Sequence, residues 1–247
     1  MKRSYEALVT GLDASTHSDG EEEYAMALVV NLPKHDKPHR NDVLVAAAQA
    51  VVATVLDPRA ADNPEFGRWY GKRIRKITRR ARNTAWERVQ DVPGVTVTYG
   101  TASVRAFVPA PVHDTDPRVD KLQIGGTDLP RDEYQGSSQG ICGVFIDASL
   151  KMTLGKATAQ VGHATMLFAA SRPFDEVESW ATDGFPLTVR EVDHDEFVAQ
   201  ASRPDAVIVH DAGFTEVAPG SATVVAVPRA PETLPNPCST AGSRRNL

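Results

Sequence analysis

The 247-residue sequence is poor in cysteine and contains no long apolar run. Two cysteines cannot supply a disulfide scaffold, and such scarcity is typical of a reducing compartment. The longest mostly apolar segment, residues 43–56, is interrupted by Gln49 and Thr54 and is shorter than the roughly 20 residues of a membrane-spanning helix. Glu6 and Asp13 interrupt any apolar core of an export signal. We therefore expect a cytoplasmic protein that has no membrane contact.

The composition is that of a globular protein, with 41% hydrophobic and 24% charged residues, which excludes a wholly disordered chain. The net charge of −5 is unevenly distributed. Residues 65–90 hold nine basic and two acidic side chains, a local charge of +7, so the remainder of the chain carries −12. This concentration indicates a local contact with a polyanion. The nine are Arg68, Lys72, Arg73, Arg75, Lys76, Arg79, Arg80, Arg82 and Arg88.

Hydrophobic periodicity predicts two α/β halves between two flexible tails. The predicted segments are a tail over 1–23, a first half over 24–127, a linker over 128–140, a second half over 141–231 and a tail over 232–247. The first half has strands at 25–30, 95–99 and 103–108 and helices at 42–56 and 65–89. The second has strands at 141–147, 185–192, 206–209 and 222–227 and a helix at 155–170. It also has one short helix that begins at Pro173 and another that is capped by Asp193 or Asp195 and ends at Ser202.

The two halves share an internal repeat. Residues 48–56 match 159–167, and residues 101–111 match 221–231, in the same order within each half. We therefore expect an α/β fold in which a small mixed β-sheet with helices on both faces is duplicated within the chain as a pseudo-dimer.

Two segments of the second half carry polar residues suited to chemistry. Gly155 and Lys156 open the predicted helix, where unpaired N–H groups and a lysine favour an anion. Gln160 and His163 follow on the same helix face. Asp211 begins directly after a predicted strand, at the carboxyl end where ligands of open α/β sheets usually lie.

These two segments resemble the type 2 (archaeal and eukaryotic) peptidyl-tRNA hydrolase family. The resemblance covers about residues 141–231 and implies a compact α/β domain that usually works as a homodimer and hydrolyses the ester between a peptide and tRNA. The matching positions are Met152, Gly155, Lys156, Ala159, Gln160, His163, Ala164, Asp211, Ala212, Gly213, Thr215, Pro219 and Gly220.

The resemblance implies a catalytic set of Lys156, Asp211, Thr215 and His163, with Gly155, Gln160 and Gly213 contacting the substrate. Lys156 would stabilise negative charge, Asp211 would orient the lysine or a water, and Thr215 would position water or substrate. His163 has an ordinary pKa near 6.5 that suits proton transfer, or it serves packing and hydrogen bonding. Ser149 and Phe214 replace an aspartate and an arginine that are common in the family.

The first half lacks this chemistry. Val45 and Val52 stand where the repeat places Lys156 and His163. We interpret it as a non-catalytic copy in the place of a second subunit, whose basic helix over 65–89 binds tRNA through residues such as Arg73, Lys76 and Arg80. The apolar stripe of that helix is Trp69, Ile74, Ile77, Ala81, Ala85 and Val89, which leaves the arginines opposite.

Other functions remain open at this point. One is a non-catalytic RNA- or protein-binding module that keeps the fold, and another is hydrolysis of a different acyl ester on a nucleotide or RNA. We expect no cofactor and no metal site, and either a monomeric pseudo-dimer or a homodimer.

Overall fold

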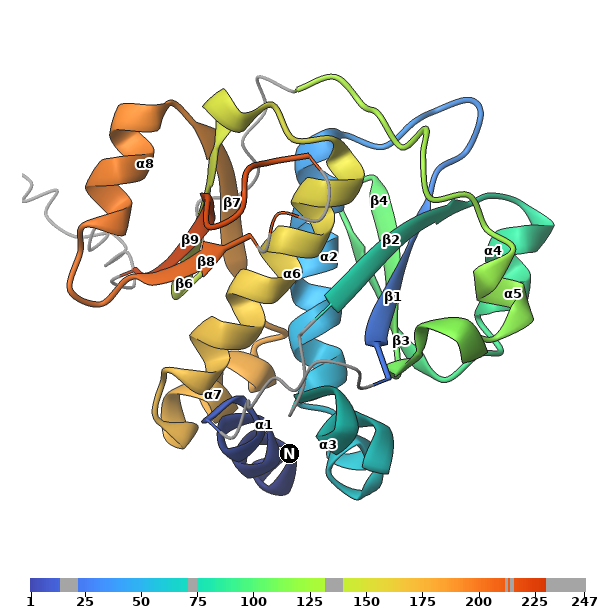
Figure 1. Ribbon diagram of the computed structural model, residues 1–247, viewed down its shortest axis with the longest axis horizontal. Helices are drawn as coiled ribbons and strands as arrows, with labels where there is room; N and C mark the ends of the chain where they lie inside the picture. Colours follow the sequence, from blue (N-terminus) through green and yellow to red (C-terminus); the bar gives the residue numbers. More distant parts are fainter. Residues whose placement is uncertain (14–21, 71–74, 132–139, 212, 214–215, 230–247) are drawn as a thin grey trace, which may run out of the picture.

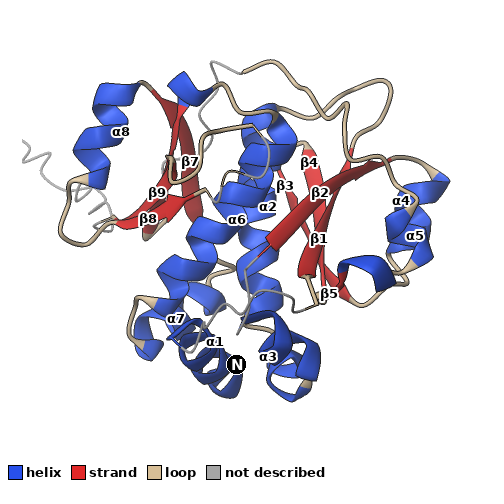
Figure 2. Ribbon diagram, viewed as in Figure 1, coloured by secondary structure: helices blue, strands red, loops and turns tan. Residues whose placement is uncertain are grey.

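Two β-sheets lie on opposite sides of a pair of central helices in the computed structural model (Figures 1 and 2). The two central helices are α2 (Arg40–Val55) and α6 (Leu154–Ala170), which pack against each other. Among the described residues, no helix is long and apolar enough to cross a membrane. The structure describes residues 1–13, 22–70, 75–131, 140–211, 213 and 216–229.

The first sheet belongs to the N-terminal half and has the strand order β2-β1-β4-β3. β1 runs parallel to β2 and antiparallel to β4, and β3 is antiparallel to β4. A two-residue strand, β5, pairs with β1. The elements of this half are α1 (Lys2–Asp13), β1 (Tyr24–Asn31), α2, η1 (Pro58–Asp62), α3 (Pro64–Tyr70), β2 (Arg75–Ala81), α4 (Thr84–Val89), β3 (Gly94–Tyr99), β4 (Ala102–Phe107), β5 (Ala110–Pro111), η2 (Val112–Asp114) and α5 (Pro117–Asp120).

The second sheet repeats this topology with the order β7-β6-β9-β8. β6 runs parallel to β7 and antiparallel to β9, and β8 is antiparallel to β9. Both halves therefore place the first strand of the half in the interior and the second and third strands at the edges. The elements of this half are β6 (Cys142–Asp147), η3 (Ala148–Leu150), α6, α7 (Phe174–Thr182), β7 (Leu187–Val192), α8 (His194–Ala201), β8 (Val207–His210) and β9 (Ala222–Pro228).

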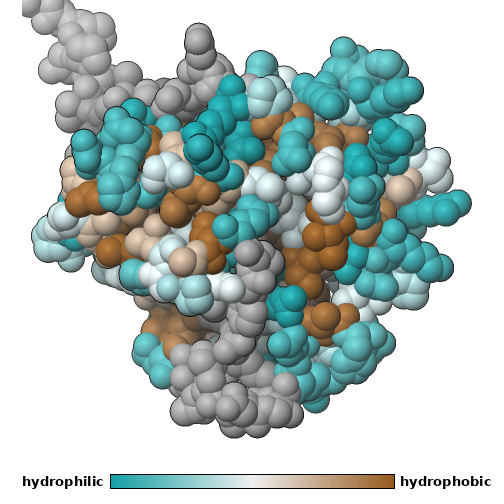
Figure 3. Space-filling model, turned by 45° about the horizontal axis from the view of Figure 1, so that its top comes forward, coloured by the Kyte–Doolittle hydropathy of each residue, from teal (hydrophilic) through white to brown (hydrophobic). Residues whose placement is uncertain are grey.

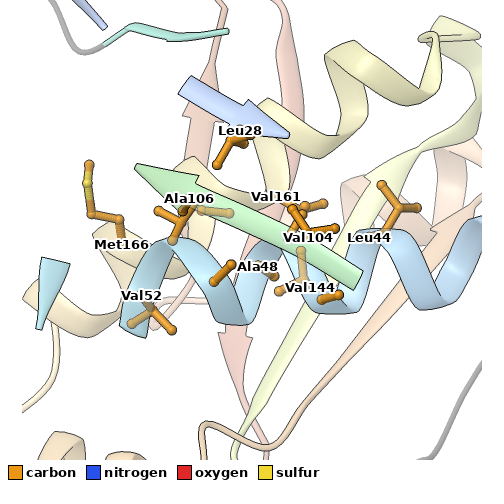
Figure 4. Close-up of a cluster of buried hydrophobic side chains, with 14 of the residues drawn as sticks. Leu28, Leu44, Ala48, Val52, Val104, Ala106, Val144, Val161 and Met166 are labelled. Atoms are coloured by element: carbon orange, nitrogen blue, oxygen red, sulfur yellow. The ribbon is translucent and has the colours of Figure 1, made fainter. Parts of the chain in front are cut away.

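The two halves share one hydrophobic core around α2 and α6. Helix α2 is apolar around nearly its whole circumference, as expected for a helix that is covered on all sides. In Figure 4, Leu28 of β1, Val104 of β4, Val144 of β6 and Val161 of α6 gather around this helix. The helices α4 and α8 cover the outer faces of the two sheets over smaller apolar clusters. On the face drawn in Figure 3, hydrophilic and hydrophobic side chains are interspersed.

The predicted fold class is confirmed: an α/β fold with small mixed sheets that have helices on both faces. The predicted strands and the two central helices lie within a few residues of their expected positions.

The predicted long helix over 65–89 is wrong. That stretch contains α3, the edge strand β2 and α4, and its residues 71–74 lie outside the described part. Pairing of β2 with β1 supplies long-range hydrogen bonds that outweigh local helix propensity. The arginines therefore do not form one solvated helix face, since Arg79 is buried and donates to the Asp120 carboxylate and to two backbone carbonyls.

The prediction of a flexible lead-in over 1–23 is wrong for its first part. Helix α1 packs against η1 and α3, and its Leu8 is fully buried. The Ser4 hydroxyl donates to the Asp57 carbonyl at 2.7 Å, and the Tyr5 hydroxyl donates to the Arg172 carbonyl at 2.6 Å. Tyr5, Leu8 and Leu12 form an apolar stripe at helical spacing, which gives this short helix a face to bury. The predicted tail over 232–247 and most of the predicted linker lie outside the described residues.

Candidate functional site

A groove of about 470 Å³ opens between the N-terminal half of α6, the end of β8 and the edge strand β2. In Figure 1, α6 lies between β8 and β2, which belong to different halves of the chain. A connecting segment over 124–128 forms a further wall. The groove therefore draws its side chains from both halves.

Lys156 enters this groove from the first turn of α6. Thr153 caps the helix, because its hydroxyl accepts a hydrogen bond from the Lys156 backbone N–H at 3.3 Å. The Lys156 ammonium forms an ion pair with the Asp211 carboxylate, and both side chains are largely buried, with 12% and 6% exposed. Lys156 and Asp211, which are 55 positions apart in the sequence, thus meet in one groove.

Asp211 lies directly after β8 and is held by three further contacts. Its second carboxylate oxygen accepts from the backbone N–H of Gly213 at 2.8 Å. Its backbone N–H donates to Ser221 at 2.9 Å, and its carbonyl accepts from Gly220 at 2.7 Å. Gly213 has φ of +79°, and a Cβ there would clash with Pro219, so this turn requires glycine. The turn fixes the direction in which the Asp211 carboxylate points.

Gln160 links the carboxylate to the second sheet. Its side-chain amide donates to Asp211 at 2.5 Å, and its carbonyl accepts from the Thr223 hydroxyl of β9 at 3.0 Å. Both Gln160 and Thr223 are buried. Sequence reasoning missed Thr223, although its polar side chain inside the apolar strand over 222–227 is a signal that could have found it.

His163 lies two turns further along α6, beside Lys76 of β2. The Lys76 Nζ is 3.1 Å from the His163 Nδ1, 3.9 Å from the Met166 sulfur and 4.9 Å from the centre of the Trp69 ring. Burial, and secondarily the nearby Lys76, lower the pKa of His163 well below 6.5. Burial also lowers the pKa of Lys76 to about 7. A neutral imidazole that faces Lys76 fits the hydrogen-bonding role of His163 better than proton transfer.

The N-terminus of α6 already holds an anion from the chain itself. The Glu216 carboxylate accepts from the Thr153 backbone N–H at 2.8 Å and from the Thr153 hydroxyl at 2.6 Å. Such a carboxylate is favoured by the positive end of the helix. Sequence reasoning assigned no role to Glu216.

The remaining predicted site residues have mixed outcomes. Gly155 lines the groove, where a Cβ would lie 3.2 Å from the Thr127 hydroxyl oxygen. Arg80 does not line it, and its guanidinium donates instead to the Gln123 side chain. Thr215 and Arg73, like Phe214, lie outside the described residues. Among the residues that are described, no group of three histidine, cysteine or acidic side chains gathers as metal ligands.

A family profile and individual relatives that resemble this chain carry the same description. The family profile described as "Peptidyl-tRNA hydrolase PTH2" matches residues 142–238. A peptidyl-tRNA hydrolase of Pyrobaculum aerophilum is 32% identical over 103 residues, which cover 37% of this chain and 85% of the relative. One of Saccharolobus solfataricus is 29% identical over 104 residues, which cover 37% of this chain and 87% of the relative. The family profile covers the C-terminal half and begins after the N-terminal half has ended.

Proposed function

The chain belongs to the type 2 peptidyl-tRNA hydrolase family, and from this premise we propose that it hydrolyses the ester between a peptide, or an N-blocked amino acid, and tRNA. The observation that carries the proposal is the ion pair of Lys156 and Asp211 in a groove that also holds Gln160. The two motifs of the family resemblance are far apart in sequence, and their key residues share one site.

The arrangement suggests a division of roles. Hydrolysis of an ester develops negative charge on the carbonyl oxygen, and a preorganised cation in a partly dry groove stabilises it. We assign this role to Lys156. Asp211 holds the ammonium in place, and Gln160 holds Asp211. His163 supports Lys76, and Thr215 stays the predicted residue for positioning water or substrate.

We further propose that the fold arose by duplication and that the N-terminal half occupies the place of a second subunit. Identical strand order and strand directions in the two sheets support this. The repeat match makes Val51 the equivalent of Gly162, and a Cβ on Gly162 would lie 2.6 Å from Val51. Equivalent residues meet at a twofold axis, so this contact is what a pseudo-dimer predicts. A monomer would then suffice for activity.

The test is release of N-acetylated amino acid from tRNA by the full chain. Lys156→Met and Asp211→Asn should each lower kcat/KM by about 100-fold or more, the usual effect of losing one oxyanion-stabilising group or its support. Lys37→Met and Asp36→Asn are matched controls, since both residues are exposed and do not line the groove. Turnover by the two site variants at the wild-type rate would refute the site assignment.

The same assay addresses the alternatives. A wild-type chain that binds tRNA without turnover would support a non-catalytic RNA-binding module. Hydrolysis of other acylated nucleotides without hydrolysis of N-acetylaminoacyl-tRNA would support a different esterase. We expect a cytoplasmic role in translation for the hydrolase.

A further inference from the structure

Strand β2 of the N-terminal half lines the groove with three polar residues, Arg75, Lys76 and Thr78. Lys76 and Thr78 both line this groove, and residues two apart on a strand lie on the same face. Their Cα atoms are therefore separated by roughly 7 Å. Helix α6, which carries Lys156, packs against β2.

Lys76 differs from Lys156 and Arg75, the other lysine and the arginine of the groove, because those two form ion pairs with carboxylates. Lys156 is paired with Asp211, and Arg75 is paired with Glu23 at 2.6 Å. Within the described part of the chain, no carboxylate lies at ion-pair distance from Lys76. Its contacts are an imidazole nitrogen, a thioether and an indole ring. A lysine in such surroundings gains most from an anion that arrives with a ligand.

Thr78 supplies an independent observation. The residue is only 5% exposed, and its hydroxyl oxygen is buried and has no hydrogen-bond partner among the described residues. A buried hydroxyl without a partner is unfavourable unless a ligand or water completes it. The side chain lies near Gly155, because a Cβ on Gly155 would be 3.9 Å from the Cβ of Thr78.

We propose that Lys76 and Thr78 form a phosphate subsite that binds the sugar–phosphate backbone of the terminal nucleotides next to the scissile ester. This inference rests on the proposed hydrolase function. His163, the neighbour of Lys76, follows Lys156 by seven residues on α6, a rise of about 10 Å. A 3′-terminal nucleotide with its ester at Lys156 then extends its backbone along α6 toward β2.

The subsite gives the N-terminal half a defined role. The family match begins at residue 142, so Lys76 and Thr78 lie outside it. The half contributes a binding wall to the groove that holds Lys156 and Asp211, in place of a separate basic helix for tRNA. Burial lowers the pKa of Lys76 to about 7, so an arriving phosphate also favours its protonated form.

The experiment measures hydrolysis of N-acetylphenylalanyl-tRNA by the full chain as a function of salt. Lys76→Met should raise KM about tenfold with kcat within twofold of wild type, because one charge-assisted hydrogen bond to a phosphate is lost. The slope of log KM against log salt should fall by about 0.7, the value for one phosphate contact on a single strand. Thr78→Val should raise KM and leave the slope unchanged, and Thr78→Ser should restore KM.

A second measurement locates the phosphate. N-acetylphenylalanyl esters of adenosine and of the dinucleotide CpA differ by one nucleotide and its phosphodiester. Wild type should prefer the CpA ester by about tenfold in kcat/KM, and Lys76→Met should lose most of that preference. Lys37→Met, a change of the same type at an exposed position outside the groove, should behave as wild type in both measurements.

The outcomes separate the two proposals. Absence of wild-type turnover on every ester would overturn the proposed function. Wild-type turnover with an unchanged salt slope in Lys76→Met would overturn the phosphate subsite and leave the hydrolase intact. A large fall in kcat with unchanged KM would likewise overturn the subsite, because Lys76 would then act on the chemical step.

Discussion

Replacement of Lys76 by methionine should stabilise the folded protein, and the gain should shrink as the pH rises. Lys76 lies among His163, Met166 and Trp69, with Arg75 preceding it on the same strand. Burial lowers the pKa of its ammonium from 10.5 to about 7. The folded protein therefore binds the Lys76 proton much less tightly than the unfolded chain does.

The direction and size of the effect follow from proton linkage. Between pH 7 and pH 9, the unfolded chain keeps the proton on Lys76, whereas the folded protein is about half protonated at pH 7 and almost wholly deprotonated at pH 9. The unfolded state thus binds more protons, and the free energy of unfolding of wild type rises with pH. One proton contributes about 1.4 kcal/mol per pH unit once the folded protein has lost it, which gives roughly 2 kcal/mol across this window because the loss is only half complete at pH 7. Methionine does not titrate, so the advantage of Lys76→Met over wild type should fall by that amount.

Urea unfolding of wild type and Lys76→Met at pH 7, 8 and 9, followed by tryptophan fluorescence, measures this difference. The window excludes His163, whose imidazole is neutral above pH 7 in the folded protein and mostly neutral in the unfolded chain. Lys37→Met, at an exposed lysine, should track wild type at every pH. A difference between Lys76→Met and wild type that stays constant from pH 7 to pH 9 would refute a lowered Lys76 pKa.

Two further predictions concern the packing of one half against the other. Gly162→Ala places a Cβ 2.6 Å from Val51 and should lower the free energy of unfolding, measured by urea titration, by about 1–3 kcal/mol. The double variant that also carries Val51→Ala should recover most of the lost stability. Arg40 of the first half is largely buried and donates two hydrogen bonds to the Glu191 carboxylate of the second half. Arg40→Met should therefore lower the free energy of unfolding by about 3 kcal/mol. An unchanged midpoint and slope in urea titrations would show that this ion pair contributes nothing to stability.

The predictable part of the structure is the part where local pattern and tertiary contacts agree. The apolar run over 222–227 becomes the interior strand β9, and the stretch that begins at Gly155 becomes most of α6. The proximity of Lys156 and Asp211 followed from the family resemblance and from the rule that ligand sites lie at strand ends. The turn at Asp211 is specified locally by Gly213 and Gly220, both with positive φ.

The predicted helix over 65–89 was wrong because the structure of this segment depends on contacts that no local sequence pattern reveals. Arg75, Ile77 and Arg79 fit a strand as well as they fit a helix, and pairing with β1 decides between them. Arg79 is tolerated in a buried place because Asp120 and two carbonyls accept its hydrogen bonds from more than 40 residues away. Thr78 was missed, and Lys76 was assigned to tRNA binding on a separate helix and not to the groove, because β2 meets α6 only through the packing of the two halves.

The same packing explains why the chain should have one catalytic groove. Leu28 and Val144 are equivalent, because they pair with Ala106 and Ala226, which the repeat matches. Thr78 pairs with Leu28 and Val189 pairs with Val144, so these two residues are equivalent as well. Two residues earlier on each strand, Leu187 of β7 is the equivalent of Lys76. The repeat makes Val45 and Val52 the equivalents of Lys156 and His163. Leu187, Val45 and Val52 are all at most 2% exposed.

Three polar positions of the groove thus correspond to three buried aliphatic side chains between α2 and β7. Burying such side chains stabilises the fold by about 1.5–3 kcal/mol each, which a solvated lysine or histidine at the same positions would forfeit. A single substitution such as Val45→Lys therefore cannot restore a second site, because the ammonium would enter the shared core without a groove, a carboxylate partner or water. The duplication hypothesis consequently predicts one active groove per chain. In the copy that lost its catalytic residues, the aliphatic side chains that replaced them stabilise the central helix pair.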